Sequence, residues 1–124
     1  MTDLNKILGD AGENFAAEYL KKNGYKILAK NFRVQTAEID IIAELDEKII
    51  FVEVKTRSNT RRGLPAEAVN LRKQKKIIQA ASVFLQDAIY SDRACRFDVI
   101  EVYSDGKEFK IRHIENAFEV ITAF

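Results

Sequence analysis

Hydrophobic and polar positions follow two periods along this chain, and the periods divide it into helical and extended segments. Residues 3–23 carry apolar side chains every three or four positions, which predicts a helix that ends at Asn23-Gly24. A second helical pattern runs from Pro65 to Tyr90, and Asn70 is placed to cap a separate helix within it. Runs rich in Ile, Val and Phe predict five strands, at residues 25–34, 37–43, 48–57, 96–103 and 107–114.

The predicted order is α-β-β-β-α-β-β, which is typical of a mixed α/β domain with helices packed on a central sheet. A length of 124 residues is the size of one domain, and no linker, repeat or low-complexity segment divides it. The tail from Asn116 to Phe124 suits a helix or a strand equally. We therefore interpret residues 1–124 as a single α/β domain.

Composition excludes several classes of site. One cysteine, Cys95, excludes an internal disulfide framework, and one histidine, His113, leaves too few ligands for a zinc site. No apolar run approaches the ~18 residues of a membrane span, and the N-terminus has no signal-peptide pattern. We therefore expect a cytoplasmic protein with no membrane partner.

Charge is unevenly distributed, although the net charge is only +1. Residues 55–76 hold eight bases and one acid, whereas residues 1–54 and 77–124 each carry a net charge of −3. A cationic block in a mildly acidic protein favours a polyanion such as DNA, although a solvated loop and helix face would look the same. The bases are Lys55, Arg57, Arg61, Arg62, Arg72, Lys73, Lys75 and Lys76.

One strand carries charges on a single face, because alternate residues of a strand point the same way. In the run Phe-Val-Glu-Val-Lys-Thr-Arg at 51–57, these are Glu53, Lys55 and Arg57. If this strand forms a hairpin with the preceding strand, Glu53 lies opposite Asp40, and Lys55 lies opposite Glu38.

Two opposed carboxylates repel each other, and a proton, a nearby base or a divalent cation would relieve the repulsion. Mg²⁺ typically takes one or two carboxylates, with water and substrate phosphate at its other positions. The cluster of Glu38, Asp40, Glu53 and Lys55 supplies such carboxylates, and the cationic block would bind the substrate phosphate. A solvated, salt-bridged face is the alternative, since an acid-x-Lys pattern occurs four times in this chain.

The same residues resemble a family signature. An acid, a spacer and then Glu-x-Lys in a hydrophobic strand is the signature of the PD-(D/E)xK nucleases, and here it reads Asp40, then Glu53-Val54-Lys55. More closely, the chain resembles the bacterial YraN-like family of predicted endonucleases, which is distantly similar to archaeal Holliday-junction resolvases. One departure is Ala37, where glycine is expected. The matching stretches are Gly9-x-x-Gly12-Glu13, Glu38-Ile39-Asp40, residues 51–57, residues 75–85 and Arg96-Phe97-Asp98-Val99.

The resemblance implies a restriction-endonuclease-like core and a metal-dependent DNA endonuclease that hydrolyses phosphodiester bonds, with branched or structured DNA as a candidate substrate. It implies that Asp40, Glu53 and the Val54 carbonyl hold Mg²⁺, or Mn²⁺ in its place. Lys55 would position or deprotonate the attacking water and stabilise charge on the phosphate. Glu13 would be a further acid near the metal, although its place on the helix suits a surface residue equally.

Supporting roles follow from the same resemblance. Glu38 would be a partner of Lys55, and the bases of the cationic block, Arg57, Lys75 and Lys76 among them, would hold the DNA backbone. Apart from the resemblance, Asp98 is interpreted as a member of a structural ion pair with Arg96 or another base. A homodimer and an activating protein partner are both compatible with the family likeness. Two other functions stay open: a nucleic-acid-binding module that does not cut, and an assembly subunit, which would need an exposed apolar patch.

Overall fold

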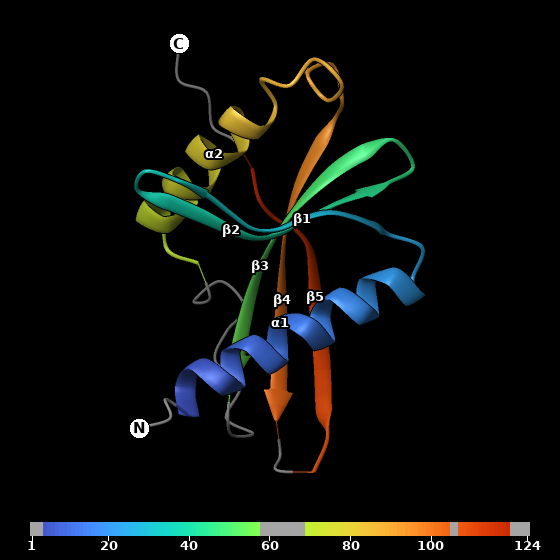
Figure 1. The fold of residues 1–124 in the computed structure, drawn as a ribbon, viewed down its shortest axis with the longest axis vertical. Coiled ribbons are helices and arrows are strands. Elements are labelled where there is room, and N and C mark those ends of the chain that lie inside the picture. The colour runs from blue at the N-terminus through green and yellow to red at the C-terminus, as the bar shows by residue number, and fades with distance from the viewer. Residues whose placement is uncertain (1–3, 58–68, 105–106, 120–124) are drawn as a thin grey trace.

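The structure of this chain is a computed structural model that describes residues 4–57, 69–104 and 107–119 (Figure 1). The elements follow the predicted order and confirm the predicted mixed α/β class, and their arrangement is consistent with a restriction-endonuclease-like core. The elements are α1 (Leu4–Lys22), β1 (Lys26–Val34), β2 (Ala37–Leu45), β3 (Lys48–Arg57), α2 (Leu71–Phe84), β4 (Cys95–Ser104) and β5 (Phe109–Phe118).

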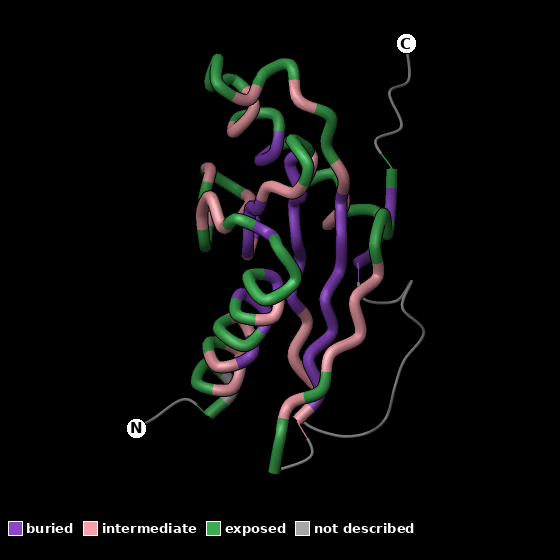
Figure 2. Tube along the Cα trace, turned by 90° about the vertical axis from the view of Figure 1, so that its right-hand side faces the viewer, coloured by how far each residue is buried: buried purple, intermediate pink, exposed green. Residues whose placement is uncertain are grey.

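The five strands form one sheet in the order β1-β2-β3-β4-β5. Only β3 and β4 are parallel among these neighbours, and α2 lies in the connection between them. The two helices cover opposite faces, because alternate side chains of β3 belong to different core clusters: Phe51 packs with α2, and Val52 packs with α1. Figure 2 shows the buried residues gathered along the central strands, with exposed residues on the outer sides of the helices.

The second helix is shorter than its sequence pattern. It begins at Leu71, and the side chain of Asn70 caps it by accepting the backbone N–H of Lys73 at 2.9 Å. The prediction of helix as far as Tyr90 is wrong, because α2 ends at Phe84 and a series of turns follows. In these turns the Asp87 side chain accepts the N–H of Ile89 at 3.1 Å, a local bond that competes with a helix. Pro65 lies outside the described residues.

The hairpin of β2 and β3 has the predicted register over its closed end, from Leu45↔Lys48 to Ile41↔Val52. Its two turn residues, Asp46 and Glu47, have φ angles of 49° and 67°, as a tight hairpin turn with the right twist requires. The described ladder ends at Ile41↔Val52. The expectation that Asp40 and Glu53 form a regular ladder pair is therefore wrong.

The ladder ends because β1 and β2 share a kink beside Asp40. Asn31 in β1 has a φ of 54°, and the regular pairs on either side of it are Lys30↔Ile41 and Phe32↔Ile39. The kink changes the face on which side chains lie, so that Ile39 packs toward α2 whereas Ile41 packs toward α1. The hairpin of β1 and β2 thereby leaves β3 and runs toward α2, which opens a fork between β2 and β3 (Figure 1).

Candidate active site

The fork between β2 and β3 brings together the residues of the Glu-x-Lys signature. The Asp40 carboxylate accepts the backbone N–H of Val54 at 2.8 Å, so it stays attached to β3 where the ladder has ended. Glu53 is only 5% exposed and lies on the α2 side of the strand, with the same parity as Phe51. Lys55 is the next residue on that side, and its Nζ lies 3.8 Å from Oε1 of Glu53.

A second lysine makes the tighter contact with Glu53. Lys73 Nζ, from the first turn of α2, lies 2.7 Å from Oε1 of Glu53. From the sequence, Lys73 was expected among the bases that hold the DNA backbone, and its inward position was not predicted. Its signal was helical spacing, because Lys73 precedes the buried Ile77 by four residues and so lies on the stripe that faces the sheet.

Burial weakens the acidity of both carboxyl groups in the fork, and a neighbouring carboxylate adds to the effect at each, Glu13 for Asp40 and Asp40 for Glu53. Burial, opposed by the Val54 N–H bond and assisted by Glu13, raises the pKa of Asp40 from 3.8 to about 6. Burial and the charge of Asp40 raise the pKa of Glu53 from 4.5 to about 7, although Lys73 and Lys55 act in the opposite direction. Two of the three ways to relieve the repulsion between the carboxylates are therefore supported. A base, Lys73, pairs with Glu53, and the raised pKa values favour a proton on one of the carboxyl groups.

Glu13 of α1 reaches Asp40 from the opposite face of the sheet. The two carboxyl groups are close enough for each to shift the pKa of the other, and a hydrogen bond between them would require a proton on one of them. Burial and the charges of Glu38 and Asp10 raise the pKa of Glu13. The structure thus places Glu13 at the candidate site.

The two lysines respond differently to the fork. Burial and the neighbouring charge of Lys73 lower the pKa of Lys55. Partial burial also lowers the pKa of Lys73, but its hydrogen bond to Glu53 and the charge of that group outweigh burial, so the net shift is upward. Lys73 is therefore the charged ion-pair partner of Glu53, and Lys55 is the amine that loses its proton more readily.

A cavity of about 330 Å³ opens at this fork, between the β1–β2 turn and the start of α2. Its charged lining is balanced, with acids from the sheet facing bases from the helix. The acids are Glu38, Asp40 and Glu53, and the bases are Arg72, Lys73 and Lys76.

Other residues of the predicted site do not take the positions expected for them, or lie outside the described residues. Glu38 lines the cavity, but it pairs with Arg33 at 3.1 Å instead of facing Lys55 across a ladder. Arg57 donates to the fully buried Glu101 at 3.1 Å, on the stretch of sheet beyond α2. Lys75 is exposed and does not line the cavity. Arg61 and Arg62 lie outside the described residues.

Comparison with known proteins places this chain in a family. The family described as "Uncharacterised protein family UPF0102" matches residues 12–102. The chain belongs to this family. A UPF0102 protein of Clostridioides difficile is 51% identical over 92% of this chain and 98% of its own length. Another, from Caldanaerobacter subterraneus subsp. tengcongensis, is 47% identical over 91% and 95%. A third, from Alkaliphilus oremlandii, is 49% identical over 93% and 100%.

The solved structure of Pyrococcus furiosus SfsA in complex with Ca²⁺ aligns with 94% of this UPF0102 chain, at 16% identity and a TM-score of 0.39. The chain spans 65% of the length of that protein, and a likeness this weak says nothing about function. Within the described part of the UPF0102 chain, no helix combines the length and the apolar character that a membrane crossing needs.

The donor set of the UPF0102 site suits a hard cation. Across residues 4–57, 69–104 and 107–119, no three side chains of the types His, Cys, Asp and Glu are grouped to hold a metal ion. Mg²⁺ needs fewer, since one or two carboxylates and water or phosphate oxygens complete its shell. In an extended strand the N–H and C=O of one residue point to the same neighbour, so the Val54 carbonyl faces Asp40 as its N–H does. Asp40, Glu53 and this carbonyl are therefore compatible with Mg²⁺.

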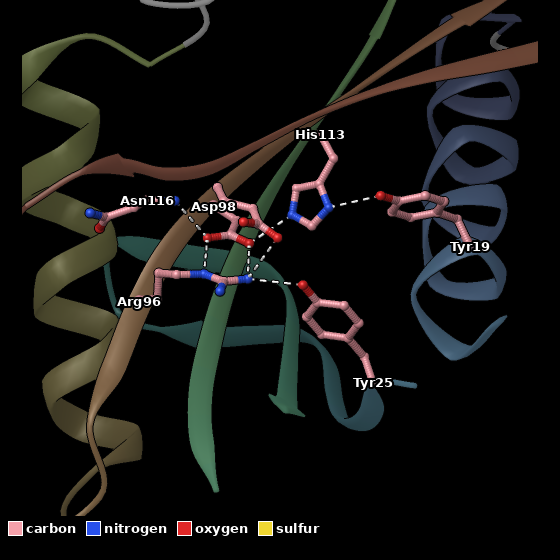
Figure 3. A network of polar contacts seen from close by, with 7 residues as sticks. Tyr19, Tyr25, Arg96, Asp98, His113 and Asn116 are labelled. Carbon is pink, nitrogen blue, oxygen red and sulfur yellow. Dashed lines mark hydrogen bonds and ion pairs between the residues drawn. The ribbon is translucent and has the colours of Figure 1, made fainter. Parts of the chain in front are cut away.

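A second buried polar network lies on the α1 face and is structural (Figure 3). Asp98, fully buried, accepts from Nε of Arg96 at 2.8 Å and lies 2.7 Å from Nε2 of His113. It also accepts the backbone N–H of Asn116, whose φ of 51° marks the irregularity in β5. Tyr19 of α1 contacts Nδ1 of His113 at 3.0 Å. The predicted Arg96–Asp98 ion pair within β4 is confirmed, and the network around it joins β4 to β5 and α1.

Proposed function

We propose that this UPF0102 protein is a metal-dependent endonuclease that hydrolyses phosphodiester bonds in DNA, including branched or structured DNA. The observation that carries the proposal is the buried carboxyl pair at the fork, Asp40 and Glu53, beside Lys55 and a cavity with a cationic wall. A binding module that does not cut has no use for desolvated acids next to its bases, because the acids repel phosphate.

The carboxyl pair supports the metal part of the proposal. The charged forms of Asp40 and Glu53 are unfavourable in the protein alone, and a divalent cation would stabilise both of them. Mg²⁺ or Mn²⁺ bound there would lower the pKa of a water molecule and polarise the phosphate. Glu13, which neighbours Asp40, would accept the proton that Asp40 releases when it becomes a ligand.

Lys55 supports the hydrolytic part. It lies beside Glu53 on the strand, and burial with the charge of Lys73 lowers its pKa. An amine with a lowered pKa is better suited to accept a proton from water, and in its charged form it stabilises the charge that develops on phosphate. We assign Lys55 these two roles.

The opposite wall of the cavity supports the choice of a phosphate substrate. Arg72, Lys73 and Lys76 project from the first two turns of α2, where the helix dipole also favours an anion. A phosphodiester seated in the cavity would thus lie between these bases and the carboxyl pair. Lys55 does not line the cavity itself, but its Nζ lies 3.8 Å from Glu53, which does, so we propose that the scissile bond lies on that side of the cavity.

Cleavage assays on a panel of labelled DNAs test the proposal. Single-stranded, duplex, flap and four-way-junction substrates would be incubated with wild type, Asp40→Asn and Lys55→Ala in Mg²⁺, Mn²⁺ or chelator. Two matched controls change exposed residues away from the fork, Asp92→Asn and Lys26→Ala. We expect metal-dependent cutting by wild type and both controls, and loss of at least about 100-fold in both site variants.

Two results would contradict the proposal. If every variant binds DNA and none cuts with either metal, the protein is a nucleic-acid-binding module on this fold. If wild type cuts and Asp40→Asn cuts equally well, the reaction takes place elsewhere. Repeating the assay at increasing protein concentration, with the oligomeric state measured by light scattering, tests our further proposal that the active form is a homodimer.

A further inference from the structure

The cation beside Glu53 comes from the helix, although the signature lysine lies on the same strand. Lys73 Nζ is 2.7 Å from Glu53 Oε1, whereas Lys55 Nζ is 3.8 Å from the same atom. The charge of Lys73 also acts on Asp40. One ammonium group thus offsets the charge of both carboxyl groups that the proposed function assigns to the metal.

We propose that Lys73 is an internal counter-ion that occupies the cation position of the fork and must leave Glu53 before a divalent metal binds. The inference rests on the proposed function, because it concerns the same two carboxyl groups. An ammonium and a metal cannot both lie against Glu53 without strong mutual repulsion. Removal of Lys73 is therefore expected to tighten metal binding, which is the opposite of what removal of a ligand does.

The surroundings of Lys73 allow the side chain to leave while the helix stays in place. Its backbone N–H is fixed by the cap at Asn70, but its side chain is 42% exposed and has four rotatable methylene groups. The cavity between Arg72 and Lys76 is open to it. The displaced ammonium therefore moves into the space where the proposed function places the substrate phosphate.

This movement couples the two ligands. The metal releases Lys73 from Glu53, and a phosphate in the cavity provides the ammonium with a new partner. Each ligand then raises the affinity of the other by the same factor, as linkage requires. The free protein is accordingly expected to bind metal weakly, and the protein with DNA to bind it more tightly.

Direct measurement of Mn²⁺ binding tests the inference without any reaction. The free Mn²⁺ signal in electron paramagnetic resonance would be followed for wild type, Lys73→Met and Lys76→Met, each checked by circular dichroism for folding. Lys76→Met is the matched control, since it removes one positive charge from the lining of the same cavity. We expect about tenfold tighter Mn²⁺ binding in Lys73→Met and at most about a threefold change in Lys76→Met.

Coupling is measured by repeating the titration with a phosphorothioate DNA duplex that resists cutting. The duplex is expected to tighten Mn²⁺ binding to wild type about tenfold and to Lys73→Met much less. Lys73→Arg keeps the positive charge, so its affinity for Mn²⁺ in the absence of DNA is expected to stay near that of wild type. This result would show that the effect of Lys73→Met comes from the lost charge and not from the substitution as such.

The outcomes separate this inference from the proposed function. If wild type and Lys73→Met bind Mn²⁺ equally, or Lys76→Met tightens binding as much as Lys73→Met, the inference is wrong and the proposed function stands. If Lys73→Met binds more weakly, Lys73 supports the metal and the inference is reversed. If neither protein binds Mn²⁺ while both are folded, the metal-dependent function fails and the inference fails with it.

Discussion

At the scale of single residues, the carboxyl groups of the fork are shifted in the direction that destabilises the folded chain. A carboxyl group whose pKa is higher in the folded state binds its proton more tightly there, so its contribution to stability falls as pH rises. For Asp40 this loss begins near pH 3.8 and is complete above the folded value of about 6, and for Glu53 above about 7. Desolvated acids that cost stability are typical of sites kept for function.

The first prediction concerns Asp40→Asn, in which an amide oxygen still accepts the Val54 N–H. At pH 4 Asp40 is largely protonated, and the variant is expected to match wild type in its free energy of unfolding. At pH 7.5 in chelator the variant is expected to be more stable by on the order of 1 to 2 kcal/mol, because it removes a buried charge. Urea denaturation at the two pH values measures the difference. A variant less stable than wild type at pH 7.5 would contradict it.

The second prediction applies the same chemical change to Asp98. Although burial opposes it, the hydrogen bonds from His113 and Arg96 hold the pKa of Asp98 below its ordinary value. This group therefore stabilises the fold above pH 3.8, and the contribution is lost as pH falls through the lower, folded pKa. Asp98→Asn is expected to cost about 3 kcal/mol at neutral pH, because it removes the buried carboxylate that pairs with Arg96 and leaves that guanidinium with the exposed Glu115 at 3.7 Å.

Urea denaturation measures this cost, and comparison with Asp40→Asn controls for the chemistry of the substitution. The same replacement is thus expected to stabilise the protein at the fork and to destabilise it on the α1 face. Metal affinity of the folded Asp98→Asn protein is expected to equal that of wild type. A lowered affinity at full folding would mean that the network of Figure 3 belongs to the site.

Sequence alone predicted part of the site, and the physical reason is distance along the chain. Strand alternation and a short hairpin placed Asp40, Glu53 and Lys55 together, because these effects act over a few residues. The position of Lys73 depends on how α2 packs against the sheet, and the local sequence pattern does not determine this packing. Its four-residue spacing from Ile77 indicated an inward side, but nothing local indicated that Glu53 would be its partner.

At the scale of elements, one close approach sets the distance between α1 and β3. A Cβ added at Gly12 would overlap Oγ1 of Thr56 and lie 3.1 Å from its Cβ, whereas a Cβ at Gly9 would meet nothing within 4 Å. Gly12 precedes Glu13, so the contact between helix and strand also sets where Glu13 meets Asp40. The two glycines of one helix therefore serve different purposes.

The third prediction follows from this difference. Gly9→Ala is expected to stabilise the protein by about 0.5 to 1 kcal/mol, because alanine costs less backbone entropy in a helix. Gly12→Ala is expected to cost about 1 to 3 kcal/mol, because the added methyl group overpacks the contact with Thr56. Thermal denaturation of the two variants measures both signs, and each serves as the control of the other. Equal stabilisation by both would contradict the close approach.

Element boundaries show which local signals were reliable. The capping of α2 by Asn70 and the register of the β2–β3 hairpin followed from the sequence, because caps and alternation are local. The end of α2 was not predicted, because the Asp87 side chain accepts the backbone N–H of Ile89 and so stabilises a turn in place of further helix. The kink at Asn31 was also missed, and it decides how far β2 runs beside β3.

At the scale of the whole molecule, the two faces of the sheet have different tasks. The α1 face holds the buried ion-pair network that joins β4, β5 and the helix, and the α2 face holds the cavity with its bases. Within the described part of the chain, Glu13 on the α1 side acts on Asp40 at the fork, so the two faces meet there. Stability and the proposed chemistry are thus separated across one sheet, and substitutions on the two faces are expected to act independently.

The last prediction uses this division to locate the DNA. Each phosphate contact by a base contributes about one ion to the salt dependence of binding, so log K falls with log salt by a slope of about −0.9 per contact. Both lysines are exposed, but Lys76 lines the cavity and its neighbour Lys75 lies outside the lining. Lys76→Gln is therefore expected to reduce the slope by about one, and Lys75→Gln to leave it nearly unchanged.

Fluorescence anisotropy of a labelled duplex, titrated at several salt concentrations in chelator, measures the two slopes. The variants are matched, because they remove the same charge from adjacent positions of one helix. Equal reductions in both would mean that DNA lies along the outer side of α2, away from the carboxyl pair. A reduction confined to Lys76→Gln would place the phosphate backbone within the cavity, which is where Lys55 and the fork require it.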